Sequence, residues 1–252
     1  MTNKTALVTG GSRGLGKEMA LRLAGAGHDV VLTYVSQKEA ADSVVKEIEA
    51  MGKRAITLRF DANDIASIDE FVKEFEQKIT SQWNTKKIDF LINNAGMGAS
   101  IPYAEAKESD FDLFMNVHFK SVYFLTQKLL PLINNGGRII NISSGTTKSS
   151  VPGYSLYSPM KGAVEVFSRG LAKELGDRHI TVNVVAPGPI ETDFNHGSNR
   201  DNAERKKFLA SRSALGRVGL VTDVGGVIAF LCSDDGYFIN GQRIEVSGGV
   251  NL

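Results

Sequence analysis

Short apolar segments alternate with helical patterns along the whole chain, and this alternation constrains the fold more than any other feature. The apolar segments are nearly continuous runs, which is typical of strands covered on both faces. The expected strands are residues 6–8, 29–34, 54–60, 88–92, 138–143, 181–186 and 243–246. The expected helices are residues 15–26, 39–51, 65–79, 110–132, one that follows Tyr157, and 223–232. Parallel strands joined by helical crossovers give this order. We therefore predict an α/β fold with a doubly wound, mostly parallel, seven-stranded sheet and helices on both faces.

The chain has 252 residues and no linker or repeat, so we expect a single domain, residues 1–252. The longest stretch without strand character is residues 187–219, which is polar and contains a short helical pattern ending near Phe208. Long insertions in compact domains often act as lids or binding loops. This one follows a strand, where open α/β sheets bind ligands, so we predict a substrate lid at about residues 189–215.

Composition excludes several kinds of partner. Lys and Arg number 29 and Asp and Glu number 28, a net charge of +1, so we expect neither nucleic acid nor a membrane surface as a partner. The first residues show neither the pattern of a signal peptide nor a membrane span, which predicts a cytoplasmic protein. The one cysteine, Cys232, excludes an internal disulfide and lies in an apolar run typical of a buried helix.

A glycine-rich turn, residues 9–16, follows the first expected strand and opens the first expected helix. Gly10, Gly14 and Gly16 would permit a tight turn, close approach of the backbone to a pyrophosphate, and close packing of helix and strand. The helix N-terminus would supply free N–H groups for phosphates. The spacing is wider than G-x-G-x-x-G, and a glycine-rich turn without a ligand is the alternative interpretation.

The end of the second expected strand bears on the choice of dinucleotide. An acidic residue there usually binds the ribose 2′-OH of NAD, and residues 33–38 contain none. Arg13, Ser36 and Lys38 could instead face a 2′-phosphate. We therefore expect NADP(H) to be preferred, with NAD(H) possible. The alternative for Arg13 and Lys38 is ordinary surface charge.

Tyr157 and Lys161 are four residues apart, which places both side chains on one face of a helix. A nearby ammonium favours a phenolate, so Lys161 should lower the pKa of Tyr157. Such a phenol can give a proton to a carbonyl oxygen or take one from an alcohol. The pair alone would also fit a solvated helix face.

Five motifs in order give a more specific indication. They are T-G-x-x-x-G-x-G at 9–16, N-N-A-G at 93–96, the asparagine of 115–117, Y-x-x-x-K at 157–161 with a serine 13 residues earlier, and P-G at 187–188. Over essentially its whole length the chain resembles the short-chain dehydrogenase/reductase family, and in particular its NADPH-dependent carbonyl and 3-oxoacyl reductases. The resemblance implies a Rossmann fold and a homo-oligomer, expected to be a tetramer.

The resemblance also implies roles for individual residues. Tyr157 would be the general acid in reduction, and Lys161 would lower its pKa and bind the nicotinamide ribose. Ser144, selected over Ser143 by its spacing, would hydrogen-bond the substrate oxygen. Asn116 would hold a water that links Lys161 to solvent.

The predicted cofactor site combines these residues with the glycine turn and the 2′-phosphate residues. It comprises Gly10, Ser12, Arg13, Gly14, Leu15, Gly16, Tyr34, Ser36, Lys38, Asp61, Ala62, Asn93, Ala95, Gly96, Tyr157, Lys161, Pro187, Gly188, Ile190 and Thr192. By the same resemblance, Asp61 would bind the adenine amine, Asn93 would steady the sheet near the adenosine ribose, and Thr192 would bind the carboxamide. A turn or helix-cap aspartate is the alternative for Asp61.

Other residues give weaker indications. Met97, Ile101, Tyr154 and Phe194 border the expected cleft, and contact with substrate and a purely structural role are equally compatible with each. Ser144 lacks the G-x-S-x-G setting of a hydrolase. No metal site is expected, because the histidines lack ligand spacing and are best interpreted as core or surface residues; they are His28, His118, His179 and His196.

Three hypotheses for function follow. The main one is an oxidoreductase that transfers a hydride from NADPH to a ketone, aldehyde or 3-oxoacyl carbonyl. The second is an NAD-dependent alcohol dehydrogenase on the same fold, and the third is a non-catalytic protein that senses NADP(H). In each case the partner is a small molecule.

Overall fold

The computed structural model describes residues 3–252, apart from the side chain of His196. Seven parallel strands form one sheet in the order β3-β2-β1-β4-β5-β6-β7. The strands are β1 (Thr5–Val8), β2 (Asp29–Tyr34), β3 (Ala55–Arg59), β4 (Ile88–Asn93), β5 (Ile133–Ile142), β6 (Thr181–Pro187) and β7 (Arg243–Val246). The predicted doubly wound α/β fold is confirmed, with every strand pair parallel.

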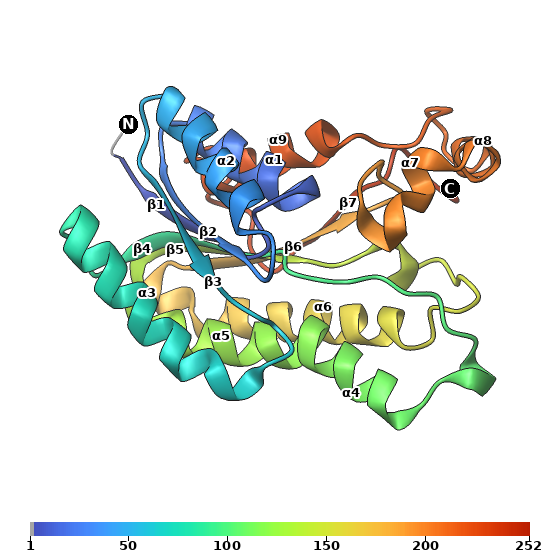
Figure 1. The fold of residues 1–252 in the computed structure, drawn as a ribbon, viewed down its shortest axis with the longest axis horizontal. Coiled ribbons are helices and arrows are strands. Elements are labelled where there is room, and N and C mark those ends of the chain that lie inside the picture. The colour runs from blue at the N-terminus through green and yellow to red at the C-terminus, as the bar shows by residue number, and fades with distance from the viewer. Residues whose placement is uncertain (1–2) are drawn as a thin grey trace.

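Helices cover both faces of the sheet (Figure 1). One layer contains α1 (Gly14–Gly25), α2 (Lys38–Ala50) and α9 (Val221–Cys232). The other contains α3 (Ile68–Trp83), α4 (Glu108–Met115), α5 (Ser121–Leu129) and α6 (Tyr157–Glu174). Alternate strand residues face opposite layers: Leu7 packs with the α3, α5 and α6 side, while Ala6 and Val8 pack with the α1, α2 and α9 side. Both faces are therefore apolar, as the continuous strand runs predicted.

The predicted helix at 110–132 is divided by a π-helical segment, Asn116–Lys120, between α4 and α5. A π turn accommodates one residue more than an α turn and is frequent at functional sites. Here two consecutive residues, Val117 and His118, are both buried. A pattern based on 3.6 residues per turn does not predict such an insertion.

Strand β5 begins at Ile133, five residues before the predicted start. The four residues after Ile133, Asn134-Asn135-Gly136-Gly137, are polar and glycine-rich, which is typical of a loop. The pairing of β5 with β4 changes register between Ile88 and Phe90. Ile133 pairs with Ile88 and Arg138 with Phe90, so residues 134–137 form an irregularity in the strand that has no partner in β4.

The 189–215 segment contains a 3-10 turn (Phe194–Gly197) and the helices α7 (Ser198–Asp201) and α8 (Ala203–Ser211). In Figure 1 these orange elements lie beyond the carboxyl ends of the strands. Cys232 is buried in α9, as predicted. Within residues 3–252, no helix has the length and apolar character needed to cross a membrane.

Candidate active site

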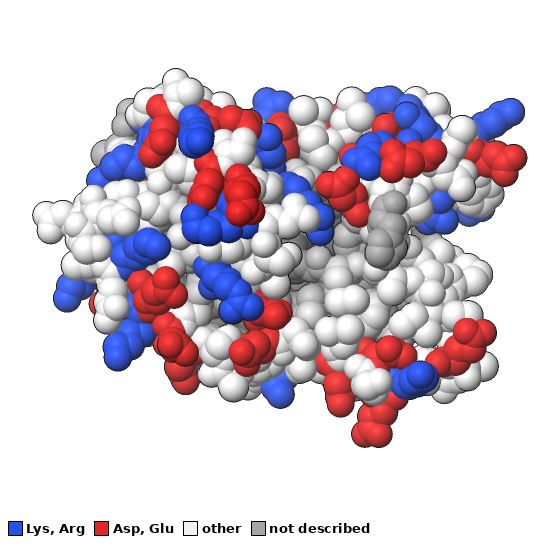
Figure 2. All heavy atoms as spheres, viewed as in Figure 1, with Lys and Arg blue, Asp and Glu red and all other residues white. Residues whose placement is uncertain are grey.

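A cavity of about 1120 Å³ lies at the carboxyl ends of the strands. Its walls come from the glycine turn after β1, the loops after β2, β4, β5 and β6, the start of α6, and the 189–215 segment. Strand order reverses between β1 and β4, and open α/β sheets bind ligands at such a point. Figure 2 shows the surface hollowed below the 189–215 segment, with acidic and basic side chains interspersed around it.

The glycine turn has the close packing that its sequence predicted. Gly10 and Gly14 have φ values of +66° and +54°, in the region that glycine favours. At Gly16, a Cβ would lie 2.8 Å from the carbonyl carbon of Gly10 and 2.6 Å from Asn94 Nδ2. Thr9 Oγ1 accepts hydrogen bonds from the backbone N–H groups of Asn94 (3.0 Å) and Ala95 (2.9 Å). The turn is thereby fixed to the loop after β4.

Helix α1 begins at this turn, and its N-cap residue, Arg13, makes no side-chain capping bond. The first N–H groups of a helix have no intrahelical partner and attract anions. The α1 N-terminus therefore presents donors to the cavity. Among the described residues, no carboxylate pairs with the Arg13 side chain, which is exposed and lines the cavity.

Most predicted site residues line the cavity. They are Gly10, Ser12, Arg13, Gly14, Leu15, Gly16, Tyr34, Ser36, Ala95, Gly96, Ser144, Tyr157, Lys161, Pro187, Gly188, Ile190 and Thr192. Of the residues predicted to bind the 2′-phosphate, Lys38 is not among them. Its Nζ lies 2.6 Å from Asp42 Oδ2, one turn along α2, so the ion pair directs the ammonium along the helix.

Four further predicted residues lie outside the cavity wall. Asn93 is buried, and its Nδ2 donates to Asn141 Oδ1 (2.7 Å) and Thr126 Oγ1 (3.0 Å), which joins β4 to β5 and α5. Asp61 accepts from the backbone N–H of Asn63 in a turn. Ala62 is buried in the core, and Asn116 Nδ2 donates to Asn63 Oδ1 at 3.3 Å.

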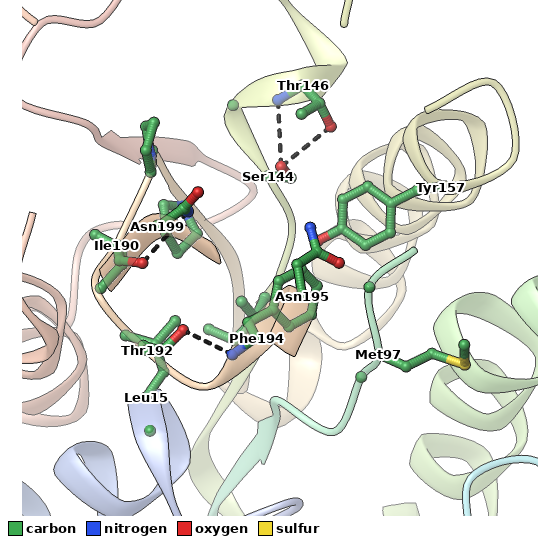
Figure 3. Close-up of a pocket in the computed structure, with 18 of the residues that line it drawn as sticks. Leu15, Met97, Ser144, Thr146, Tyr157, Ile190, Thr192, Phe194, Asn195 and Asn199 are labelled. Atoms are coloured by element: carbon green, nitrogen blue, oxygen red, sulfur yellow. Dashed lines mark hydrogen bonds between the residues drawn. The ribbon is translucent and has the colours of Figure 1, made fainter. Parts of the chain in front are cut away.

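Tyr157 and Lys161 come from the first two turns of α6, and both are buried. Lys161 Nζ donates to the backbone carbonyl of Ile142 (2.8 Å) and lies 5.7 Å from the centre of the Tyr157 ring. Ser144 and Tyr157 face the same space, with Phe194 and Asn195 opposite them (Figure 3). The sequence thus predicted correctly that these side chains meet.

The hydroxyls of the two neighbouring serines have different partners. Ser144 Oγ accepts from the backbone N–H (3.2 Å) and the hydroxyl (3.1 Å) of Thr146. Ser143 Oγ donates to Glu165 Oε1 at 2.6 Å. The Ser144 hydroxyl keeps its own proton available for a further acceptor, whereas the Ser143 proton is committed to a carboxylate.

Burial dominates the ionisation of Tyr157 and Lys161. Loss of hydration lowers the pKa of Lys161 to about 8. Burial also raises the pKa of Tyr157 above its ordinary value, although the Ser144 hydroxyl acts in the opposite direction. The predicted fall in the Tyr157 pKa was therefore wrong, because desolvation of the phenol outweighs any favourable charge and Lys161 is held by the Ile142 carbonyl.

Sequence reasoning placed His118 only as a core or surface residue. The structure buries it in the wall of the cavity, with its ring edge-to-face with Tyr157 at a centroid distance of 5.0 Å. Burial and the charge of Lys161 hold the pKa of His118 well below its usual range, so the imidazole is neutral. No spacing in the sequence indicated this position, since the π turn creates it.

The 189–215 segment also contributes contacts that the sequence did not specify. Asn195 Nδ2 donates to the Tyr154 hydroxyl at 2.7 Å. A Cβ at Gly98 would lie 2.7 Å from Cζ of Phe194, so glycine permits the close approach of this segment to the loop after β4. The other histidines lie elsewhere: His28 is buried, His179 occupies a left-handed turn, and the side chain of His196 is outside the described residues.

Comparison with known proteins identifies the family. Residues 10–251 match the family model described as enoyl-(acyl carrier protein) reductase. A hydroxynaphthalene reductase-like protein, Arp2 of Metarhizium robertsii, is 36% identical over 260 residues, which span 99% of this chain and 95% of the relative. A short chain dehydrogenase of Claviceps purpurea is 35% identical, over 99% of this chain and 96% of the relative.

Solved structures agree with these relatives. LugOII, described as a promiscuous reductase that catalyses keto-reduction at C1 during lugdunomycin biosynthesis, has 38% identity and a TM-score of 0.94, over 100% of this chain and 99% of the other. The angucycline C-6 ketoreductase LanV with bound NADP has 36% identity and a TM-score of 0.94, over 99% of this chain and 96% of the other. The chain belongs to the short-chain dehydrogenase/reductase family and is an oxidoreductase.

Proposed function

We propose that the protein is an NADPH-dependent carbonyl reductase in which Tyr157 is the general acid. The observation that carries this proposal is the placement of the Tyr157 and Ser144 hydroxyls in one cavity with the glycine turn. The raised pKa of Tyr157 is consistent with the reductive direction, because the phenol holds its proton at neutral pH and has it to give. The hydride would come from the reduced nicotinamide of NADPH.

The residues of the cavity fit a dinucleotide. The crowding at Gly16, the positive φ values of Gly10 and Gly14, and the free α1 N-terminus together form a cradle for a pyrophosphate. Arg13 and Ser36 would bind the 2′-phosphate. Tyr34, Ala95 and Gly96 would line the adenosine part, with Pro187, Gly188, Ile190 and Thr192 on the nicotinamide side.

Each catalytic residue would have a separate role in the transfer of the proton. Tyr157 Oη would give its proton to the substrate oxygen, and Ser144 Oγ would donate a hydrogen bond to the same oxygen as negative charge develops there. Lys161, as an ammonium below its pKa of about 8, would stabilise the phenolate that remains. Asn116 would hold a water through which Lys161 returns a proton from solvent.

For the substrate we propose a ketone carried on an apolar body, ahead of an aldehyde or a 3-oxoacyl group. Met97, Tyr154, Phe194 and Phe208 give the cavity apolar and aromatic surface around the hydroxyl pair. The ketoreductases LanV and LugOII, which have similar structures, support this choice. We propose further that the 189–215 segment is a lid and that the protein is a homotetramer, which light scattering would measure.

Cofactor choice and turnover test the proposal together. Purified protein should oxidise NADPH in the presence of a panel of apolar ketones, and kcat/KM should be higher for NADPH than for NADH. Arg13→Ala should reduce that preference by about ten-fold, the effect of losing one charged phosphate contact of about 1.4 kcal/mol. Lys38→Ala is the matched control and should leave it unchanged, because Lys38 pairs with Asp42.

Two outcomes would contradict the proposal. A strong preference for NADH would favour the NAD-dependent alcohol dehydrogenase. Tight NADPH binding without turnover of any carbonyl, unchanged in Tyr157→Phe, would favour a cofactor-sensing protein.

A further inference from the structure

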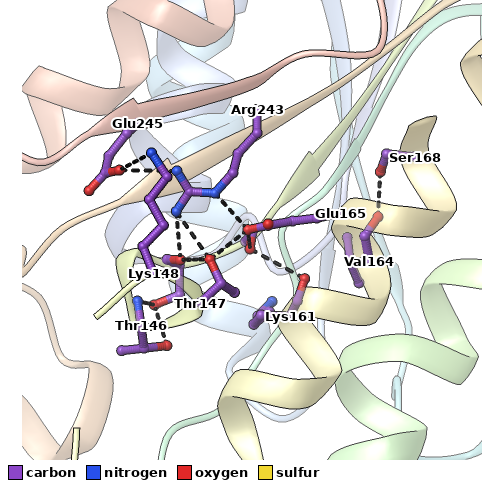
Figure 4. A network of polar contacts seen from close by, with 11 residues as sticks. Thr146, Thr147, Lys148, Lys161, Val164, Glu165, Ser168, Arg243 and Glu245 are labelled. Carbon is purple, nitrogen blue, oxygen red and sulfur yellow. Dashed lines mark hydrogen bonds and ion pairs between the residues drawn. The ribbon is translucent and has the colours of Figure 1, made fainter. Parts of the chain in front are cut away.

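Arg243, in the last strand, lies among Glu165, Thr147 and Glu245 (Figure 4), and it also contacts the main chain of Ser144. Arg243 Nη2 donates to the backbone carbonyl of Ser144 (3.2 Å) and to Thr147 Oγ1 (3.1 Å). Its Nη1 lies 3.0 Å from Glu245 Oε2. Arg243 is 99 residues from Ser144 in the sequence and does not line the cavity. It therefore contacts the serine through the backbone alone.

Glu165, on helix α6, also binds the loop that contains Ser144. Its Oε1 accepts three hydrogen bonds, from Ser143 Oγ (2.6 Å), Thr147 Oγ1 (2.8 Å) and Arg243 Nε (2.8 Å). Two of these donors lie on either side of Ser144 in the chain. Glu165 is also one turn beyond Lys161 on α6, so a single carboxylate oxygen joins the serine loop to the helix that carries the catalytic pair.

Burial makes these contacts strong. The side chains of Arg243 and Glu165 are only 12% and 13% exposed, so solvent screens their charges weakly. Burial alone would lower the pKa of Arg243, but the neighbouring carboxylates of Glu165 and Glu245 more than offset that effect, and the guanidinium stays charged. Hydrogen bonds between ionised groups are about twice as strong as neutral ones. The guanidinium fork also fixes direction, because its donors are coplanar.

We propose that Arg243 and Glu165 are positioning residues for Ser144. They hold its main chain so that its hydroxyl meets the substrate oxygen beside Tyr157. This inference rests on the proposed reductase function. A purely structural role would predict lower stability of the variants with unchanged turnover, whereas positioning predicts a loss of kcat that depends on Ser144.

Arg243→Gln tests the inference, with Arg54→Gln as the matched control. Arg54 also pairs with a buried carboxylate, Asp29 Oδ2, at 2.6 and 2.9 Å, but at the amino end of β2, away from the cavity. Arg243→Gln should lower kcat for carbonyl reduction by about ten-fold or more, since a misplacement of about 1 Å can cost about a hundred-fold. Its KM for NADPH should stay within about two-fold, and Arg54→Gln should keep the kcat of the parent protein.

A double mutant distinguishes positioning from general damage. If Arg243 acts through Ser144, adding Arg243→Gln to Ser144→Ala should change kcat by less than about two-fold, because the interaction it supports is already gone. Equal losses in both backgrounds would overturn the inference.

Two replacements of Glu165 give a second measurement. Glu165→Gln keeps one acceptor oxygen of similar shape but removes the negative charge that strengthens these bonds, so it should lose about three-fold in kcat. Glu165→Leu removes the acceptor and should lose about ten-fold or more. Equal activity of the two variants would overturn the role of Glu165.

The two proposals fail in different ways. No carbonyl turnover by the parent protein overturns the proposed function and, with it, the inference. Normal turnover by the parent together with full kcat in Arg243→Gln overturns the inference alone.

Discussion

Replacing Gly16 with alanine should open the glycine turn and weaken NADPH binding. The new Cβ would overlap the carbonyl oxygen of Gly10, its nearest neighbour, and would lie 2.8 Å from the carbonyl carbon, where ordinary contact begins at 3.4 Å, so the backbone must move by more than about 0.6 Å. Neither neighbour can move away easily. The Gly10 atoms belong to the main chain of the turn, and Asn94 Nδ2, 2.6 Å away, donates a hydrogen bond to the Thr9 carbonyl. Overpacking of this kind costs about 1–3 kcal/mol of unfolding free energy. Because the displaced backbone is the phosphate cradle, the Kd for NADPH should rise by about ten-fold or more, which is 1.4 kcal/mol.

The assay is fluorescence titration with NADPH, combined with urea denaturation. Gly25→Ala is the control on the same helix: a Cβ there meets nothing within 4 Å, so binding should be unchanged. Removing that glycine should stabilise the protein slightly, by about 0.5 kcal/mol. If Gly16→Ala bound NADPH as tightly as the parent, the cradle would lie elsewhere and the reasoning would be refuted.

Three further predictions concern buried ionisable groups. Tyr157→Phe should reduce kcat by at least about a hundred-fold, the contribution of a general acid, with the Kd for NADPH retained; steady-state kinetics showing near-normal kcat would contradict it. Lys161 has a lower pKa when folded (about 8) than when unfolded (10.5), so between these values the unfolded chain binds more protons and stability rises with pH. The unfolding free energy of the parent relative to Lys161→Met should therefore increase by about 3 kcal/mol from pH 8 to pH 10.5, and denaturation curves with a constant difference would exclude the shift. Burial raises the pKa of Cys232 to about 12, so iodoacetamide at pH 8 should label it only after unfolding; mass spectrometry showing rapid labelling of the folded protein would disprove its burial.

The order of elements was predictable because its signals are local. Seven apolar runs predicted the seven strands from residues close in sequence, and the helical patterns between them predicted the layers, although the helix expected at 110–132 is divided by the π-helical segment. The pairing of Tyr157 with Lys161 was equally local, since four residues on a helix place two side chains on one face. Cys232 was predicted to be buried from its apolar neighbours alone.

Other features depended on contacts between distant segments. Strand β5 starts at Ile133 because that residue pairs with Ile88 of β4, before a register shift that leaves residues 134–137 without a β4 partner. The π turn that buries His118 against Tyr157 has no sequence period that predicts it. The ion pair between Lys38 and Asp42 likewise became visible only when both side chains were placed on α2.

Tyr157 and Lys161 show most clearly which properties the sequence determines and which depend on the tertiary structure. The sequence determined that Tyr157 and Lys161 would share a helix face and that Ser144 would stand at the end of a strand, because spacing and periodicity are properties of the chain itself. Only the tertiary structure decided the direction of the Tyr157 pKa and brought Arg243 to the carbonyl of Ser144. Desolvation and long-range hydrogen bonds arise when separate segments pack together, and no local pattern encodes how much water that packing removes.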